Sequence, residues 1–263
     1  LGSRLDAAMS STICMQDLAT LIATLKAHNE HLLTNKTLAC FLGAAGCERL
    51  SEGVEKTRQD LFDAVTRNVE GRSTIFTESM DGVASKTSTF LSTTGVAAVV
   101  STMVLEETRE KFATAKSHLD VLQGMQMHLD GLLDDAKHIP SVIASLKTKV
   151  DSTLTNLNSA FLQCIANEQI DKAEVIHQQV RDMQASNLGV DRVSGVVQQQ
   201  TVALDAKKSD FVQTCQTHLD NDNFIDLGKL LNGREGWKTG PHEQSLQWFD
   251  AIKKIKHRLR VTR

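Results

Sequence analysis

Aromatic residues are scarce in this sequence, and tyrosine is absent. Aromatic side chains make up 4% of the 263 residues, and proline occurs only twice. Compact enzymes generally use aromatic side chains to fill a thick core and line a pocket, whereas Ala, Leu, Val and Ile suffice for the narrow contact between long helices. The composition therefore favours an extended helical protein and disfavours an enzyme.

Cysteine is too sparse and scattered to provide a disulfide framework. The five cysteines are odd in number, and a chain of this length does not depend on disulfides for its core. Cys164 and Cys215 fall at apolar positions of helical stripes. We expect them to be buried, reduced thiols of a cytoplasmic protein.

The N-terminus lacks the basic start and apolar run of a secretory signal. Its first three residues, Leu-Gly-Ser, resemble the remnant of a cleaved purification tag. We therefore interpret the chain as a fragment of a longer protein.

Strand-type alternation of apolar and polar residues is also missing, whereas helical spacing of apolar residues runs through most of the chain. We expect a first helix over about 7–33, a corner at Gly43 and Gly46, and a long helix beyond Cys47. Each of these segments keeps its apolar residues on one face.

A helix boundary is predicted at residues 138–141. Pro140 disfavours helical backbone at Ile139, the residue before it. Ser141 is then placed to cap the helix that follows. The next apolar stripe begins at Leu146.

A twelve-residue segment occurs twice in altered form. Residues 165–176, IANEQIDKAEVI, return 54 positions later as residues 219–230, LDNDNFIDLGKL. In both copies we expect a long helix, a polar corner and a shorter helix, because Asn and Asp tolerate a left-handed backbone. A duplicated helical hairpin explains the match, but two unrelated corners would look as similar, since only Asn167 and Asn221 are identical.

The predicted fold class is all-α: an elongated, antiparallel, coiled-coil-like helical bundle with a smaller helical-hairpin region. We divide the chain into a tag remnant at 1–3, a long-helix bundle at 4–139, helical hairpins at 140–232, and a loop with a basic C-terminal helix at 233–263. Apolar contacts between long helices form within one chain or between two chains, so a homodimer is an open alternative.

Three patterns resemble chemical sites but do not meet their requirements. The loop GREGWKTG at 233–240 lacks the spacing and the preceding strand of a phosphate loop. A zinc site is disfavoured by the wide spacing of its candidate ligands, which are His28, His31, Cys40 and Cys47. The aspartates of 129–138 fall opposite the leucines and are expected to face solvent. We therefore predict no catalytic residue, no cofactor and no metal.

Residues 92–107, STTGVAAVVSTMVLEE, form the most apolar segment. It is shorter than the roughly 20 residues that span a bilayer as a helix. Three interpretations are open: a helix buried on all sides, a docking site for a partner helix, and a membrane-inserting segment of a helical pore-former. We favour the buried helix, because Glu106 and Glu107 make insertion costly.

The C-terminal helix is the strongest candidate for a functional surface. Residues 251–263 carry six Lys or Arg and no acidic residue, which leaves 23 basic against 32 acidic residues in 1–250. Such a basic amphipathic helix attracts acidic surfaces, for example tubulin tails or anionic lipid. The candidate partner-binding residues are Lys253, Lys254, Lys256, Arg258, Arg260 and Arg263.

These features together predict a non-enzymatic structural scaffold or spacer. It is expected to mediate protein–protein interaction in a cytoskeletal, kinetochore-like or trafficking assembly and to bind other proteins through helix–helix packing. The alternatives are a peripheral membrane or tethering module that uses the basic C-terminal helix, and a helical pore-forming protein.

Overall fold

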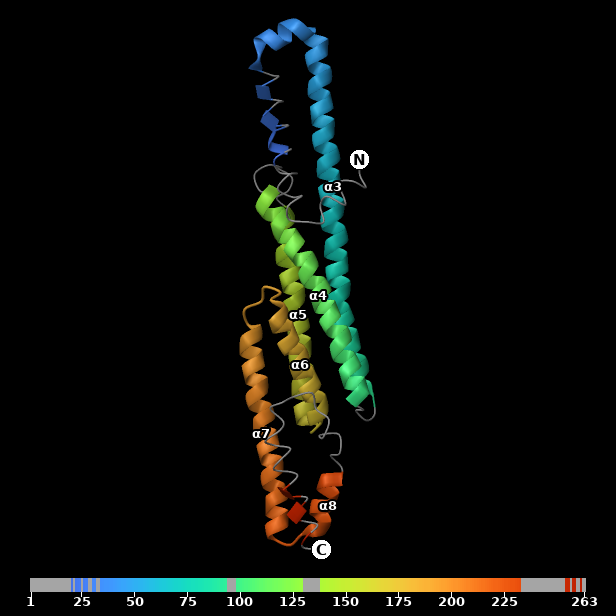
Figure 1. The fold of residues 1–263 in the computed structure, drawn as a ribbon, viewed down its shortest axis with the longest axis vertical. Coiled ribbons are helices and arrows are strands. Elements are labelled where there is room, and N and C mark those ends of the chain that lie inside the picture. Colours follow the sequence, from blue (N-terminus) through green and yellow to red (C-terminus); the bar gives the residue numbers. More distant parts are fainter. Residues whose placement is uncertain are drawn as a thin grey trace. The chain divides into compact units, whose positions relative to one another are not determined.

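The described part of the molecule consists of helices and the short connections between them (Figure 1). The computed structural model describes residues 20, 22–24, 26–27, 30–31, 34–93, 98–129, 138–232, 254–255, 257–258 and 261. None of these residues lies in a β-strand, which confirms the prediction of an all-α helical bundle.

Six helices follow one another between residues 36 and 232. They are α3 (Lys36–Ser92), α4 (Ala98–Leu129), α5 (His138–Ala166), α6 (Ile170–Ser186), α7 (Val193–Asp220) and α8 (Phe224–Asn232). The described residues between 20 and 34 and between 254 and 261 are helical as well. The last of these belong to the predicted C-terminal helix, and the remainder of that helix lies outside the described residues.

Residue contacts divide the chain into two compact units, each assembled from separate stretches. Unit 1 comprises residues 1–78 and 114–148, and unit 2 comprises residues 79–113 and 149–263. Helices α3, α4 and α5 therefore contribute residues to both units.

Unit 1 has an apolar core built from helical stripes. Between α3 and α4, Arg72 Nη1 lies 3.4 Å from His118 Nδ1. Between α3 and α5, the rings of Phe62 and His138 meet edge to face with centroids 6.5 Å apart. The buried apolar residues of this unit include Leu61, Val65, Val69, Phe76, Leu119, Leu122, Met125, Leu129, Ile139, Ile143 and Leu146.

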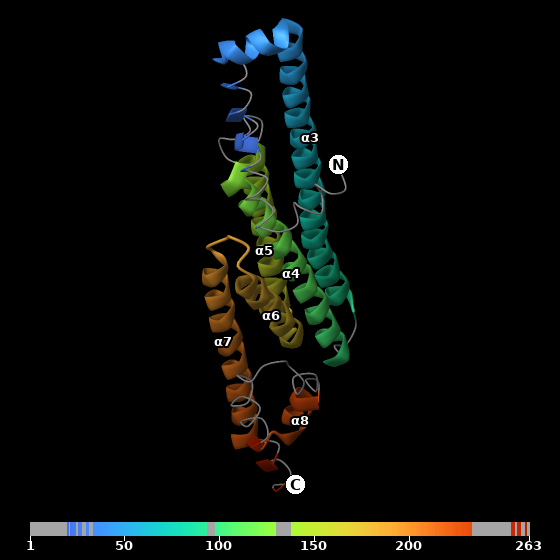
Figure 2. The same cartoon turned by 45° about the horizontal axis from the view of Figure 1, so that its top comes forward.

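Unit 2 packs parts of α3, α4 and α5 with α6, α7 and α8 (Figure 2). Ion pairs join α3 to α4 (Lys86–Glu107, 2.6 Å) and α4 to α6 (Arg109–Asp182, 2.8 Å). The buried apolar residues of this unit include Met80, Val83, Phe90, Phe112, Val150, Leu154, Leu157, Phe161, Cys164, Val180, Leu204 and Cys215. The predicted burial of Cys164 and Cys215 is confirmed, and both are free thiols.

The predicted corner in the first glycine-rich segment is confirmed at one of its two glycines. Gly43 has φ 64° and ψ 165°, so the chain changes direction there within α3. This backbone region is essentially restricted to glycine, because any Cβ collides with the neighbouring peptide groups. Gly46, in contrast, is helical.

The corners after α5 and α7 have the same backbone geometry. Glu168 and Asp222 adopt the left-handed conformation, with φ 57° and 54°. The Gln169 amide donates to Cys164 O (2.8 Å), and the Asn223 amide donates to His218 O (2.9 Å). The amides of Glu168 and Asp222 donate to the preceding helix as well, and the two hydrogen bonds at each corner form a Schellman motif. This motif satisfies carbonyl groups at the helix end. The predicted polar corners are confirmed, and their equal geometry fits both interpretations of the repeat.

The prediction that Ser141 caps a helix is wrong. Helix α5 begins at His138, so Pro140 lies in its first turn. A first turn tolerates proline because the amide hydrogen that proline lacks has no partner within the helix there. The Ser141 hydroxyl instead donates to His138 O at 2.6 Å.

The prediction that the apolar segment at 92–107 is one helix buried on all sides is also wrong. Helix α3 ends at Ser92 and α4 begins at Ala98, while residues 94–97 lie outside the described part of the chain. Val104 and Leu105 pack with Phe90 and Val175, but Met103 is 54% exposed. Only one face of α4 contacts the core near Val104 and Leu105, so Met103 on another face is exposed to solvent.

Candidate functional site

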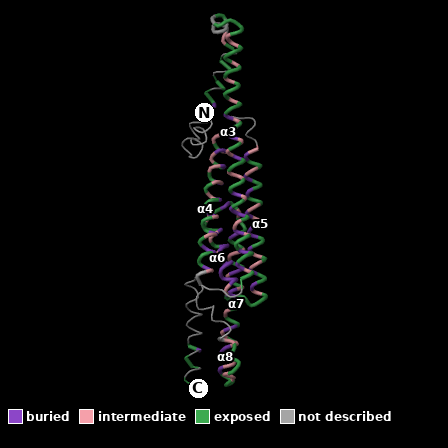
Figure 3. The backbone as a smooth tube through the Cα atoms, turned by 90° about the vertical axis from the view of Figure 1, so that its right-hand side faces the viewer, coloured by how far each residue is buried: buried purple, intermediate pink, exposed green. Residues whose placement is uncertain are grey.

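Helix α6 carries polar side chains into the core of unit 2. Ten of its 17 residues are buried (Figure 3). They include an apolar stripe at helical spacing, formed by Ile170, Ala173, Ile176, Val180 and Met183. They also include four polar residues, here named the α6 polar cluster: Lys172, Glu174, His177 and Gln179. Because other helices surround α6, residues outside its apolar stripe are buried as well.

Lys172 binds the C-terminal end of α3. Its Nζ donates to Leu91 O at 2.6 Å and to Thr93 O at 2.9 Å. The last carbonyls of a helix have no partner within the helix and carry partial negative charge, so a buried ammonium group is stabilised there. Lys172 thus attaches the start of α6 to the end of α3.

Gln179 makes a second contact with α3. Its Oε1 lies 3.2 Å from the hydroxyl of Thr87, which lies 2.9 Å from Val83 O. Among the described residues, Gln179 Nε2 is buried without a hydrogen-bond partner. A buried polar atom of this kind costs about 1–3 kcal/mol relative to a satisfied one.

His177 lies at the meeting point of α5, α6 and α7. Its Nδ1 is 3.2 Å from Gln200 Oε1, and its Nε2 is 3.4 Å from Thr201 Oγ1. The ring of Phe161 packs against it with centroids 6.5 Å apart. Gln200 Nε2 donates in turn to Asn158 Oδ1 at 3.0 Å, which extends the network from α7 to α5.

The surroundings of His177 favour its neutral form. Burial lowers the pKa of His177 below its ordinary value, and the charges of Arg181 and Lys208 lower it further. The hydrogen bond with Gln200 and the charge of Asp205 act in the opposite direction without reversing the shift.

Glu174 completes the α6 polar cluster through an ion pair with Lys208 on α7. The side chains are 6% and 12% exposed, so the pair is largely removed from water. Such a pair contributes little net stability compared with apolar packing, but the loss of one partner leaves the other charge buried and is strongly destabilising.

The α6 polar cluster has little space for a substrate. A cavity of about 20 Å³ lies beside it, lined by Glu174, His177, Arg181, Thr201, Leu204, Asp205 and Lys208. This volume holds about one water molecule. The arrangement therefore serves to join α6 to its neighbours, with each polar group directed at another helix or at that cavity.

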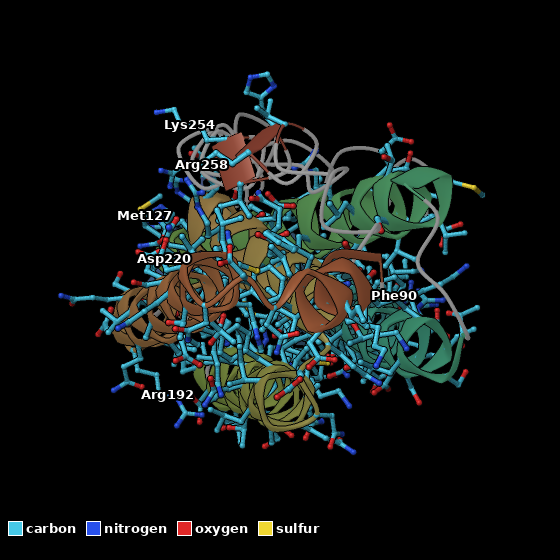
Figure 4. The ribbon with its side chains drawn as sticks, turned by 90° about the horizontal axis from the view of Figure 1, so that it is seen from below. Phe90, Met127, Arg192, Asp220, Lys254 and Arg258 are labelled. Atoms are coloured by element: carbon cyan, nitrogen blue, oxygen red, sulfur yellow. The ribbon has the colours of Figure 1, made fainter. Side chains whose placement is uncertain are left out.

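Two of the six predicted partner-binding residues lie within the described part of the chain. Lys254 and Arg258 are exposed and helical, one turn apart on the C-terminal helix (Figure 4). Ile255, between them, is 4% exposed and faces the protein. Lys253, Lys256, Arg260 and Arg263 lie outside the described residues.

The α6 polar cluster was not among the residues predicted from sequence. Helical spacing identifies the apolar face of α6, and the polar residues outside that face are normally solvent-exposed. Their burial depends on contacts with other helices, namely α3, α4, α5 and α7, which the residues of α6 do not specify. The pattern of α6 by itself carries no signal for it.

A zinc site finds no support within the described ranges, where no three His, Cys, Asp or Glu side chains are close enough to share a metal ion. Of the candidate ligands considered from sequence, His28 lies outside these ranges, and His31 Nε2 is 3.2 Å from Asn35 Nδ2. The loop at 233–240 and the aspartates of 130–137 also lie outside the described residues.

No described helix combines the length and the apolar character needed to cross a lipid bilayer. Compared with known protein families, curated proteins and solved structures, the chain shows no match.

Proposed function

We propose that this chain is a non-enzymatic structural scaffold or spacer that mediates protein–protein interaction in the cytoplasm. One observation carries the proposal: the polar groups buried on α6 are used in contacts between helices. Helix α7, which α6 contacts, has 28 residues and a length of about 42 Å. Long helices joined in this way present extended faces, on which partner helices pack.

The sizes of the cavities support a binding surface in preference to a substrate pocket. A cavity of about 260 Å³ in unit 1 lies between Ile22, Val54 and Leu61, and one of about 130 Å³ in unit 2 lies beside Ile170, Phe211 and Leu230. Small-molecule sites usually occupy roughly 300–1,000 Å³. Both cavities are smaller than this range.

Affinity purification with quantitative mass spectrometry tests the scaffold function. The matched control is Leu154→Pro, which breaks α5 at a fully buried residue and removes the packed surface. A scaffold is expected to enrich a defined group of cytoskeletal, kinetochore or trafficking proteins over this control. Equal recovery with both proteins contradicts the proposal. Light scattering on the same sample reports whether the chain is elongated and whether it is a homodimer.

A second candidate function is a tethering module that binds an acidic surface through the C-terminal helix. Lys254 and Arg258 are exposed, whereas the apolar Ile255 is buried against the protein. An amphipathic helix inserts into lipid through its apolar face. Since Ile255 is already covered, we expect attraction by charge alone, which salt screens.

Co-sedimentation with vesicles of anionic or neutral lipid tests this tethering function, with microtubules as a second acidic surface. The double variant Lys254→Gln, Arg258→Gln is expected to lose binding, and binding of the native chain is expected to weaken strongly as salt rises. Lys229→Gln, which removes one exposed charge from α8, is the matched control. Binding to neutral lipid, or binding unchanged in the double variant, contradicts the function.

A further inference from the structure

Polar groups take part in the contact between α6 and α7. Among the polar pairs that span it within unit 2 are Gln184 with Ser194 (3.0 Å), His177 with Gln200 (3.2 Å), and Glu174 with Lys208. Residue numbers rise along one helix as they fall along the other, so the helices are antiparallel. The central pair contains a buried imidazole, which is 6% exposed.

The hydrogen bonds around His177 define its neutral tautomer. Gln200 Nε2 donates to Asn158, so the Gln200 side-chain oxygen is the atom that faces His177 Nδ1. An oxygen accepts, so Nδ1 carries the ring hydrogen and Nε2 holds the lone pair. The Thr201 hydroxyl near Nε2 donates to Val197 O at 2.9 Å, so it does not block the entry of a proton at Nε2.

A proton that reaches Nε2 enters a buried region whose charged groups, two positive and two negative, already balance, so it adds a positive charge that no counterion offsets. Helix α6 contributes Arg181 and Glu174, helix α7 contributes Asp205 and Lys208, and helix α5 contributes the uncharged Phe161 and Asn158. Glu174 already pairs with Lys208. The described contacts of α3 and α4 with α6 are made elsewhere on the helix, at Lys172, Gln179 and Asp182.

Water has a route to the imidazole. The cavity of about 20 Å³ between α6 and α7 is lined by His177 together with the charged groups of both helices. Its polar lining and its volume suit a single water molecule. The imidazole can therefore exchange a proton with solvent without prior unfolding of the bundle.

We propose that the pairing of α6 with α7 is pH-sensitive, because uptake of one proton on His177 Nε2 weakens this interface and allows α7 to separate from α6. This goes beyond the scaffold function and does not depend on it. Separation exposes the buried face of α6, so access to that face is coupled to pH.

The direction of the effect follows from proton linkage. The pKa of His177 is lowered in the folded protein, so the separated state binds more protons than the packed state at mildly acidic pH. The contribution of the neutral ring is complete above the ordinary imidazole pKa of about 6.5. It is lost as the pH falls below that value towards the lowered pKa of the folded state.

Hydrogen exchange of the α7 amides between pH 7.5 and 5.5, corrected for intrinsic exchange rates, tests the proposal. For the native chain we expect the local opening constant to rise with falling pH by up to about tenfold per pH unit, the limit for one proton. His177→Gln is expected to remove this slope, while the carboxylates Glu174 and Asp205 remain in both proteins. His118→Gln in unit 1 is the matched control and is expected to keep the native slope.

A second variant keeps the test decisive if His177→Gln does not fold. Gln200→Glu places a carboxylate beside His177 Nδ1, which stabilises the charged ring, so the slope is expected to shrink markedly. The proposal is overturned if the native chain shows no slope, if His177→Gln retains it, or if Gln200→Glu leaves it unchanged.

Discussion

The two units of this protein bury different kinds of side chain. Every buried polar or charged residue that the structure describes belongs to unit 2, whereas the residues that are buried in the described part of unit 1 are all apolar. Apolar seams are non-directional and tolerate alternative alignments. Buried hydrogen bonds and ion pairs are satisfied in few alignments, so they favour one arrangement of helices at the expense of stability. Unit 2 is therefore the part whose helix pairing is most sensitive to single polar substitutions.

The largest expected effect tests whether the apolar cores of the two units are equivalent. Phe76 in unit 1 and Phe161 in unit 2 are both 0% exposed. Replacing either by Ala is expected to lower the free energy of unfolding by about 3–5 kcal/mol, measured by denaturant unfolding, because each change removes a buried ring and leaves a cavity.

The neighbouring exposed residues provide the controls for this pair. Ile75 and Leu162 are 41% and 54% exposed, so replacing either by Ala is expected to cost about 0.5 kcal/mol or less. A small loss for one Phe variant and a large loss for the other would show that only one unit has a well-packed core.

The next effect separates buried ion pairs from exposed ones. Lys208→Met leaves Glu174 charged and buried, so we expect a loss of about 3 kcal/mol in the free energy of unfolding. In unit 1, Arg58 and Glu55 pair with side chains 41% and 53% exposed, so Arg58→Met is expected to cost less than about 1 kcal/mol. The double variant Glu174→Leu, Lys208→Met is expected to recover most of the loss. If Lys208→Met and Arg58→Met lowered the free energy of unfolding equally, the buried ion pair of unit 2 would not differ in its effect on stability from the exposed pair of unit 1.

Backbone strain at the corners is expected to have opposite consequences in the two units. Gly43→Ala in unit 1 is expected to cost about 1–3 kcal/mol, because the conformation of Gly43 excludes a side chain. Beyond its neighbours along the chain, an added Cβ meets nothing within 4 Å, so the cost is one of backbone conformation and not of tertiary packing. Glu168→Gly in unit 2 is expected to stabilise by about 0.5–1 kcal/mol, since glycine adopts the left-handed region freely. Thermal unfolding measures the change in stability of both variants. Stabilisation by Gly43→Ala would contradict the strained backbone conformation given for Gly43.

The smallest effect concerns the imidazole of unit 1. Burial lowers the pKa of His118, and the charge of Arg72 lowers it further. Arg72→Gln is expected to raise this pKa without restoring its ordinary value, because burial is the larger cause. NMR titration of the ring measures the shift, and Arg67→Gln, an exposed residue one turn away, is the control. Because the folded pKa is lowered, the stabilising contribution of the neutral ring is lost as the pH falls, and this loss becomes smaller in Arg72→Gln.

Much of the fold could be predicted because its signals are local. The stripe of α6, the buried Cys164 and Cys215, and the polar corner at 167–169 follow from residue spacing and turn chemistry. The predicted boundary at 138–141 is confirmed, since α5 begins at His138, but the capping role of Ser141 is wrong because a first turn tolerates Pro140. Met103 was placed in a buried segment because an apolar run does not reveal how many neighbours its helix has.

The candidate site was far less predictable. Lys254 and Arg258 were identified by their charge, and the structure adds that Ile255 between them is covered. Glu174 and His177 carried no comparable signal, because the groups that bury and pair them, Lys208 and Gln200, belong to another helix.

The sequence by itself determined that the chain is helical and where several of its helices turn, since helical periodicity and left-handed corners depend on residues within a few positions of one another. Only the tertiary structure decided which polar residues lie inside. The energy of a buried charge or amide depends on the atoms that replace water around it, and α6 obtains those atoms from other helices.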